Sequence, residues 1–162
     1  AAELGAEVTV VDLSATMLRK FQEGLDRTGN KTNIRKVHSD IMKVEEFEEY
    51  DMVVANFFLN VFDEAFMEQV LAHLIKLGKP GAKIVVGDFE YPSGNPLARL
   101  FKHAYWYVAV FIFWAVANNA FHKIYNYPET MKKLGLSIRD KKRYALLGIN
   151  CYWSILGEKP GK

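Results

Sequence analysis

Apolar residues in the first part of the chain form short continuous runs that alternate with amphipathic segments. Val8 to Val11 is a β-branched run that predicts a buried parallel strand. Ser14 stands where a helix cap is expected, before a predicted helix over Ala15 to about Asp26. After a turn at Thr28 to Asn30, the segment Asn33 to His38 (NIRKVH) predicts a second strand.

The same alternation continues through the middle of the chain. A third strand is expected from about Asp51 to Asn56, followed by an amphipathic helix over Phe62 to Leu77. KPGAK predicts a turn, and Ala82 to Asp88 (AKIVVGD) predicts a fourth strand. Strands that alternate with helices imply right-handed crossovers, so the fold class is α/β, with a mostly parallel sheet covered by helices on both faces.

The pattern changes after Tyr91. Leu97 to Phe121 is a long helix-prone stretch, but its apolar core is shorter than the roughly 20 residues that a membrane-spanning helix needs. Leu136 to Leu147 and Asn150 to Leu156 are extended runs joined at Gly148. They predict a C-terminal hairpin that adds to the sheet in antiparallel orientation.

Composition and charge narrow the class of protein. The chain has 162 residues, of which 50% are hydrophobic and 25% charged, and we expect residues 1–162 to form a single domain. A formal net charge of +2 is too small to predict a nucleic-acid partner. Cys151 is the only cysteine, so there is no intrachain disulfide and no thiolate metal site, which favours a reducing, cytoplasmic compartment.

Three carboxylates, Asp12, Asp40 and Asp88, stand at or just past the carboxyl ends of predicted strands. In open α/β sheets, ligands bind at that edge. Nucleotide-binding α/β folds present a carboxylate at a strand end to a ribose in this way. The alternative is that Asp12 and Asp40 cap helices or turns, and that Asp88 belongs to the scaffold at the strand end.

The order of these segments resembles the Rossmann-like fold of class I S-adenosylmethionine-dependent methyltransferases. The matching pieces are VTVVDLSATML, the SD of HSDIMKV, YDMVVANFFLNVFDE and LIKLGKPGAKIVVGDFE. The resemblance implies that S-adenosylmethionine is the cofactor, that Asp12 binds both ribose hydroxyls and that Asp40 faces the adenine amino group. Leu13, Ile41 and Asn56 are assigned to the same cofactor site.

The family's first strand and its glycine-rich turn have no counterpart in this sequence. They should lie before Ala1, and the opening AAELGAE lacks the basic and apolar regions of a signal peptide. We therefore expect a chain that starts partway through the domain. The missing strand is expected to leave two strand edges unpaired and to weaken cofactor binding by this chain alone.

An aromatic stretch, HAYWYVAVFIFWAVANNAFHKIYNY, lies where the family places its substrate-covering insertion, here residues 96–128. Many aromatic residues with few charges suggest a lipophilic substrate such as a quinone, or peripheral docking on a membrane through residues 104–121. If the reaction uses a base, the candidates are His103, His122 and Tyr125. The alternatives are hydrogen-bonded surface histidines and an aromatic core.

The resemblance implies methyl transfer to a small, lipophilic, quinone-like acceptor, since GDFEYPSGNPLARLFKHAYWY is similar to ubiquinone and menaquinone methyltransferases. VVANFFLNVFDE and NNAFHKIYNY also resemble the relative that forms rhodoquinone, in which S-adenosylmethionine supplies an amino group. A dinucleotide-dependent oxidoreductase would use an acid like Asp12 too, but the closing hairpin argues for the methyltransferase topology. The non-enzymatic alternative is a truncated domain that acts through membrane or partner contacts.

Overall fold

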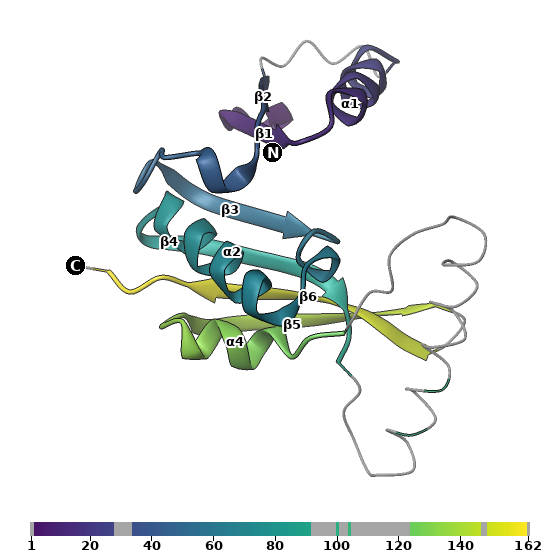
Figure 1. Ribbon diagram of the computed structural model, residues 1–162, viewed down its shortest axis with the longest axis vertical. Helices are drawn as coiled ribbons and strands as arrows, with labels where there is room; N and C mark the ends of the chain where they lie inside the picture. The colour runs from purple at the N-terminus through teal and green to yellow at the C-terminus, as the bar shows by residue number, and fades with distance from the viewer. Residues whose placement is uncertain are drawn as a thin grey trace. The chain divides into compact units, whose positions relative to one another are not determined.

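The computed structural model describes residues 2–27, 34–91, 124–146 and 149–161, together with Leu100 and Ala104. The chain forms two compact units, Ala1–Glu45 and Glu46–Lys162, and each contains a sheet of its own (Figure 1). The single domain over residues 1–162 stays a prediction. The same holds for the insertion at residues 96–128, most of which lies outside the described residues.

The first unit is a strand, helix and strand in which the two strands are parallel. Strand β1 pairs with β2 in a register that places Val8 opposite Ile34 and Asp12 opposite His38. The predicted cap is confirmed, because Ser14 Oγ accepts a hydrogen bond of 3.3 Å from the backbone N–H of Met17. The elements are η1 (Ala2–Leu4), β1 (Val8–Asp12), α1 (Ala15–Arg27), β2 (Ile34–His38) and η2 (Ile41–Lys43).

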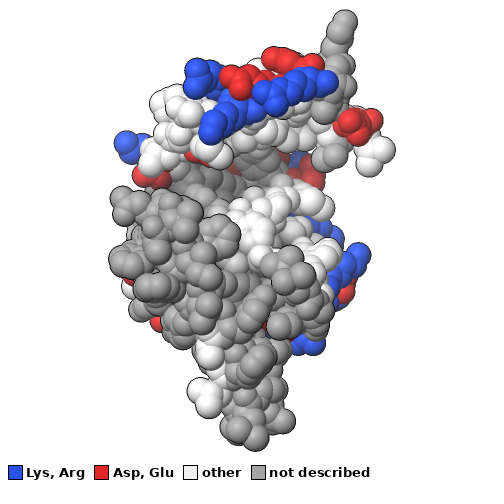
Figure 2. All heavy atoms as spheres, turned by 90° about the vertical axis from the view of Figure 1, so that its right-hand side faces the viewer, with Lys and Arg blue, Asp and Glu red and all other residues white. Residues whose placement is uncertain are grey.

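Charged side chains of both signs lie side by side on this unit. Figure 2 shows Lys and Arg next to Asp and Glu at the top of the view. One such pair on α1 joins Arg19 Nε and a carboxylate oxygen of Glu23 at 3.9 Å, and both side chains are exposed. Exposed pairs of this kind contribute little to stability.

The second unit contains a four-stranded sheet with the order β3-β4-β6-β5. Strands β3 and β4 are parallel, whereas β4 with β6 and β6 with β5 are antiparallel, which confirms the predicted C-terminal hairpin. The elements are β3 (Tyr50–Asn56), η3 (Leu59–Val61), α2 (Glu64–Leu77), β4 (Gly78–Phe89), α4 (Tyr127–Lys133), β5 (Ser137–Leu146) and β6 (Ile149–Glu158).

The core of this unit lies between the sheet and the helices α2 and α4. Helix α2 packs against β3 and β4, and α4 packs against β5 and β6. A hydrogen-bonded ion pair of 2.9 Å between Lys133 and Glu68 joins the two helices. Burial of apolar side chains supplies the main stabilisation here, and the fully buried ones include Met67, Val70, Leu71, Ile84, Val86, Met131 and Ile155.

Strands β1 and β3 each have one partner strand among the described residues. β1 pairs with β2 and β3 pairs with β4. One edge of each strand therefore lacks a strand partner in the described part of the chain, and the same holds for β2 and β5, so the expectation that a missing first strand leaves two edges unpaired stays a prediction.

The structure corrects the predicted turn at KPGAK, which belongs to β4. Gly81 adopts a φ of 81°, a left-handed conformation that glycine tolerates. Its N–H donates to the carbonyl of Pro160 at 3.3 Å, and the N–H of Lys159 donates to the carbonyl of Ala82 at 3.0 Å. Pairing with the far end of the chain keeps this segment extended, and local sequence carries no sign of that pairing.

The predicted start of the second helix at Phe62 is also wrong. The carboxylate of Asp63 accepts a hydrogen bond of 2.9 Å from the N–H of Phe66, so Asp63 is the N-cap and α2 starts at Glu64. The sequence analysis missed α4, although Pro128 in its first turn is a common start signal. The predicted helix over Leu97 to Phe121 lies outside the described residues, apart from Leu100 and Ala104.

Candidate functional site

Asp12 and Asp40 lie at the same edge of the first unit, where β1 and β2 end. Asp12 is the last residue of β1 and stands opposite His38, the last residue of β2. The N–H of Ser39 donates to the backbone carbonyl of Asp12 at 3.2 Å, which ties the segment leading to Asp40 to the end of β1. This is the edge at which open α/β sheets bind ligands.

Each of these carboxylates holds its own loop with one oxygen. Oδ1 of Asp12 accepts a hydrogen bond of 2.7 Å from the N–H of Ser14. Oδ1 of Asp40 accepts one of 2.9 Å from the N–H of Met42 and caps η2. The capping interactions considered for both residues are therefore present. Since none of the described residues donates to either Oδ2, each aspartate keeps an acceptor for a ligand, and the cofactor roles stay predictions.

The other two residues assigned to the cofactor site in this unit flank the aspartates. Leu13 is 72% exposed, and its carbonyl accepts a hydrogen bond of 2.9 Å from Nε2 of His38. Ile41 is half-buried at the start of η2. An exposed leucine beside a strand-end carboxylate suits contact with an apolar part of a ligand. The assignment of Leu13 and Ile41 to the cofactor site stays a prediction.

In the second unit, Asn56 ends β3 and lies against Gly87 of β4. A Cβ added at Gly87 would lie 2.4 Å from Oδ1 of Asn56 and 3.9 Å from its Cα, so the side chain of Asn56 lies directly over Gly87 and would have to turn away from a larger residue there. The next residue, Phe57, has a φ of 47° and donates its N–H to the carbonyl of Gly87 at 2.8 Å. The backbone of this strand end is thus held in a conformation that is unfavourable for a phenylalanine.

The sequence analysis missed an aromatic cluster formed by Phe57, Phe89 and Tyr152. Phe57 packs edge-on against Phe89 with ring centroids 5.6 Å apart, and Tyr152 lies 5.5 Å from each of the other two rings. Phe57 is 52% exposed. The cluster stands at the end of β3 and β4, where its exposed ring can contact an aromatic ligand. The only local signal for it is the pair of phenylalanines after β3.

Asp88 is 1% exposed and holds three segments of the second unit together. Oδ1 accepts hydrogen bonds from Nδ2 of Asn60 at 2.9 Å and from the N–H of Phe89 at 2.7 Å, and Oδ2 accepts one from the hydroxyl of Tyr127 at 2.8 Å. Burial and the neighbouring carboxylate raise the pKa of Tyr127 far above its usual value. These contacts fit the scaffold role considered for Asp88.

Tyr125, one of the three candidate bases, is buried beside Tyr127 and donates its hydroxyl to the carbonyl of Phe62 at 2.8 Å. Burial, followed by the negative charges of Glu64 and Asp63, raises the pKa of Tyr125. Its phenol therefore holds its proton more firmly than a free tyrosine does. A catalytic role for Tyr125 stays a prediction, and His103 and His122 lie outside the described residues.

Comparison with known proteins identifies the family. Residues 1–81 match the family model described as a methyltransferase domain. The chain belongs to this methyltransferase family. It is also similar to the ubiquinone/menaquinone biosynthesis C-methyltransferase UbiE of Stutzerimonas stutzeri, with 30% identity over 100 residues, which are 61% of this chain and 37% of that enzyme. The match thus spans well under half of the relative's length.

Solved structures show that the methyltransferase domain has the Rossmann-like fold of this class. The 1,6-didemethyltoxoflavin-N1-methyltransferase of Burkholderia thailandensis, solved with S-adenosylhomocysteine, aligns with a TM-score of 0.68 and 16% identity over 98% of this chain and 63% of its own. An S-adenosylmethionine-dependent methyltransferase of Methanosarcina mazei aligns with a TM-score of 0.70 and 14% identity over 99% of this chain and 85% of its own. At these identities the likeness concerns the fold.

Candidate membrane-spanning helices are absent from the part of the methyltransferase domain that the structure describes. The apolar core predicted over Ala104 to Ala117 lies outside that part, apart from Ala104.

Proposed function

We propose that this methyltransferase domain transfers a methyl group from S-adenosylmethionine to a small, lipophilic, quinone-like acceptor. The observation that carries the proposal is the pair Asp12 and Asp40, which end or follow two adjacent parallel strands and each present one carboxylate oxygen that the described residues leave without a donor. The family match and the fold of proteins solved with S-adenosylhomocysteine add support.

In the proposed complex, each aspartate recognises a different part of the cofactor. Asp12 accepts hydrogen bonds from the ribose hydroxyls, and Asp40 accepts one from the adenine amino group. The sulfonium supplies a methyl group that is already reactive, so the protein mainly aligns the reacting atoms and excludes water.

The acceptor is proposed from the aromatic character of the chain and from the relative in ubiquinone and menaquinone biosynthesis. The exposed ring of Phe57, supported by Phe89 and Tyr152, suits a flat apolar ring at the end of β3 and β4. Peripheral membrane contact through residues 104–121 and a cytoplasmic location belong to the same proposal, because a lipophilic acceptor partitions into a bilayer.

Asp12→Asn tests the cofactor site. Asparagine keeps an oxygen to accept from the N–H of Ser14, but it loses the charge that strengthens the bond to the ribose. We expect the variant to unfold at the same temperature and to bind S-adenosylhomocysteine about tenfold more weakly in isothermal titration. Asp26→Asn, on the exposed side of α1, is the matched control. Equal affinity of Asp12→Asn and the wild type would contradict the proposal.

The mass of the reaction product distinguishes methyl transfer from amino transfer. The chain is incubated with S-adenosylmethionine and a short-chain ubiquinone precursor, and the products are analysed by mass spectrometry. A methylated product supports methyl transfer, whereas an aminated product would replace it with the amino transfer of the rhodoquinone-forming relative. An unmodified acceptor under conditions in which the cofactor binds would contradict the proposed reaction.

A further inference from the structure

Glu90 follows β4 directly, and its side chain reaches across the sheet toward β5. Its carboxylate is 2% exposed, and Oε1 lies 2.9 Å from Nε of Arg143 on β5. Because β6 stands between β4 and β5, this ion pair has to pass over β6. Arg143 stands opposite Trp153 of β6, and Trp153 stands opposite Asp88, two residues before Glu90. The carboxylate of Glu90 and the indole of Trp153 are therefore neighbours on one face of the sheet.

Three polar atoms of this pair are buried without a hydrogen bond among the described residues: both carboxylate oxygens of Glu90, which are acceptors, and Nε1 of Trp153, a donor. Oε1 of Glu90 lies against Arg143, so the two atoms considered for a ligand are Oε2 of Glu90 and Nε1 of Trp153. The contact of Oε1 with Arg143 is an ion pair that is not aligned as a hydrogen bond. Buried polar groups are nearly always hydrogen-bonded, and an exception of this kind is a candidate for binding a ligand.

The two atoms complement a single hydroxyl group. A hydroxyl donates its hydrogen to one partner and accepts from another through its oxygen, so it satisfies Glu90 and Trp153 together. A carbonyl or an ether oxygen can accept a hydrogen bond from Trp153, but it has no hydrogen to donate to Glu90. The charge of Glu90 is balanced by Arg143, and Lys141 lies 5.5 Å from the centre of the Trp153 ring, so the pair suits a neutral hydroxyl better than a second carboxylate.

We propose that Glu90 and Trp153 form a binding site for a hydroxyl group on the aromatic ring of the acceptor. Glu90 accepts the hydrogen bond of that hydroxyl, and Trp153 donates to its oxygen. The inference rests on the proposed function, because it places the acceptor at the carboxyl end of β4, where sheets of this kind bind ligands. It goes further by naming the two side chains that select a hydroxylated ring.

A pair of matched ligands tests the site. 1-Naphthol has the hydroxyl, whereas 1-methoxynaphthalene keeps the oxygen and the apolar rings but has no hydrogen to donate. In isothermal titration of the chain, we expect 1-naphthol to bind about tenfold more tightly, because a site built to accept a hydrogen bond discriminates against a ligand that lacks the donor. Equal affinities, or no saturable binding of either ligand, would overturn the proposal.

Two variants separate the roles of the side chains. Glu90→Met removes the hydrogen-bond acceptor but keeps a side chain of similar length. It should therefore weaken the binding of 1-naphthol alone and abolish the preference for 1-naphthol over 1-methoxynaphthalene. Trp153→Phe removes the donor and should weaken both ligands. Tyr144→Phe, which removes an exposed hydroxyl on β5, should change neither. Unaltered affinities in both site variants would overturn the proposal.

Thermal unfolding of Glu90→Met distinguishes a ligand site from a structural role. This variant replaces a buried carboxylate that has no hydrogen bond in the described chain by an apolar side chain of similar length, so its unfolding temperature should be unchanged or higher. Trp153→Phe leaves a cavity at a buried position, so a lower unfolding temperature is expected for it in either case. A fall in the unfolding temperature of Glu90→Met, together with equal losses for both ligands in both variants, would assign the pair to the scaffold and overturn the proposal.

The test is independent of the proposed function. If S-adenosylhomocysteine does not bind while the preference for 1-naphthol depends on Glu90 and Trp153, the cofactor assignment fails and the hydroxyl site stands. If methyl transfer occurs and no such preference exists, the hydroxyl site fails and the proposed function stands.

Discussion

The hydroxyl of Tyr127 on α4 donates a hydrogen bond of 2.8 Å to Oδ2 of Asp88 near the end of β4, and both side chains are buried. Asn60 donates to the other carboxylate oxygen of the same aspartate. Through these hydrogen bonds Asp88 joins η3, β4 and α4 at one buried point. This junction lies beside the segment that leads to Glu90.

Tyr127→Phe should destabilise the second unit, because it removes a donor to a buried carboxylate without changing the packing of the ring. We expect a loss of about 1–3 kcal/mol in the free energy of unfolding, measured by urea denaturation. Tyr144→Phe is the matched control, since Tyr144 is exposed. Equal stability of the two variants would show that the bond to Asp88 contributes nothing net.

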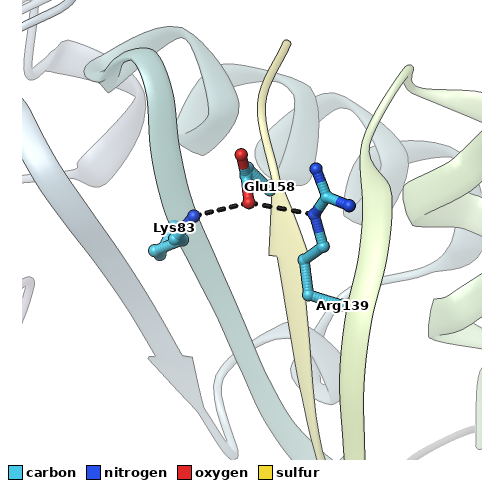
Figure 3. Close-up of polar contacts among 3 residues, drawn as sticks. All are labelled: Lys83, Arg139 and Glu158. Atoms are coloured by element: carbon cyan, nitrogen blue, oxygen red, sulfur yellow. Dashed lines mark hydrogen bonds and ion pairs between the residues drawn. The ribbon is translucent and has the colours of Figure 1, made fainter. Parts of the chain in front are cut away.

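Glu158 should make the stability of the chain depend on pH in the acid range. Its carboxylate accepts hydrogen bonds from Lys83 and from Arg139, the latter at 2.9 Å (Figure 3), and these two bonds lower the pKa of Glu158. Since the folded pKa lies below the unfolded one, the contribution of Glu158 is complete above the ordinary glutamate pKa and is lost as the pH falls through the lowered value.

The measurement for Glu158 is thermal unfolding of the wild type and Glu158→Gln between neutral pH and pH of about 3. The wild type should be the more stable protein at neutral pH, and the difference should shrink as the solution becomes acidic. Glu68→Gln, whose ion pair with Lys133 lies on the helices, is a useful comparison. A difference between wild type and Glu158→Gln that stays constant over this range would be inconsistent with the lowered pKa.

Phe57 should tolerate glycine better than alanine. Its φ of 47° costs a residue with a Cβ about 1 kcal/mol or more, and glycine relieves that cost. We expect Phe57→Gly to exceed Phe57→Ala in stability by about 1 kcal/mol in urea denaturation. At Phe47, another exposed phenylalanine, the φ is not positive, so the order should be reversed there. The same order at both sites would contradict the backbone explanation.

Gly87→Ala should be destabilising because the new methyl group would lie 2.4 Å from Oδ1 of Asn56. Because Asn56 is exposed and its amide can turn away, we expect a loss of about 0.5 kcal/mol and not the larger cost of overpacking a core. Asn56→Ala in the same chain removes the obstructing oxygen and should recover most of the loss. A double-mutant cycle with unfolding free energies checks this, and additive effects would mean that the two side chains do not interfere.

Much of the fold was predictable because its elements depend on neighbouring residues. The β-branched run from Val8 to Val11 forms the parallel strand β1, although its residues are half-buried and not buried as predicted, and Ser14 caps α1. The extended runs around Gly148 form the antiparallel pair β5 and β6. The placement of Asp12 and Asp40 at one edge followed from their positions after parallel strands, since such strands end on the same side of a sheet.

By itself, therefore, the sequence determined the order of strands and helices apart from α4, the family resemblance and the two carboxylates at the strand ends, because each depends on residues close together in the chain. Only the tertiary structure decided that KPGAK pairs with Lys159 and Pro160, and that Glu90 reaches Arg143 over Trp153. The tertiary structure also decided that Glu90, Arg143 and Trp153 lie on the same face of the sheet. These features join segments far apart in sequence, and pairing between distant strands leaves no periodic pattern in either of them.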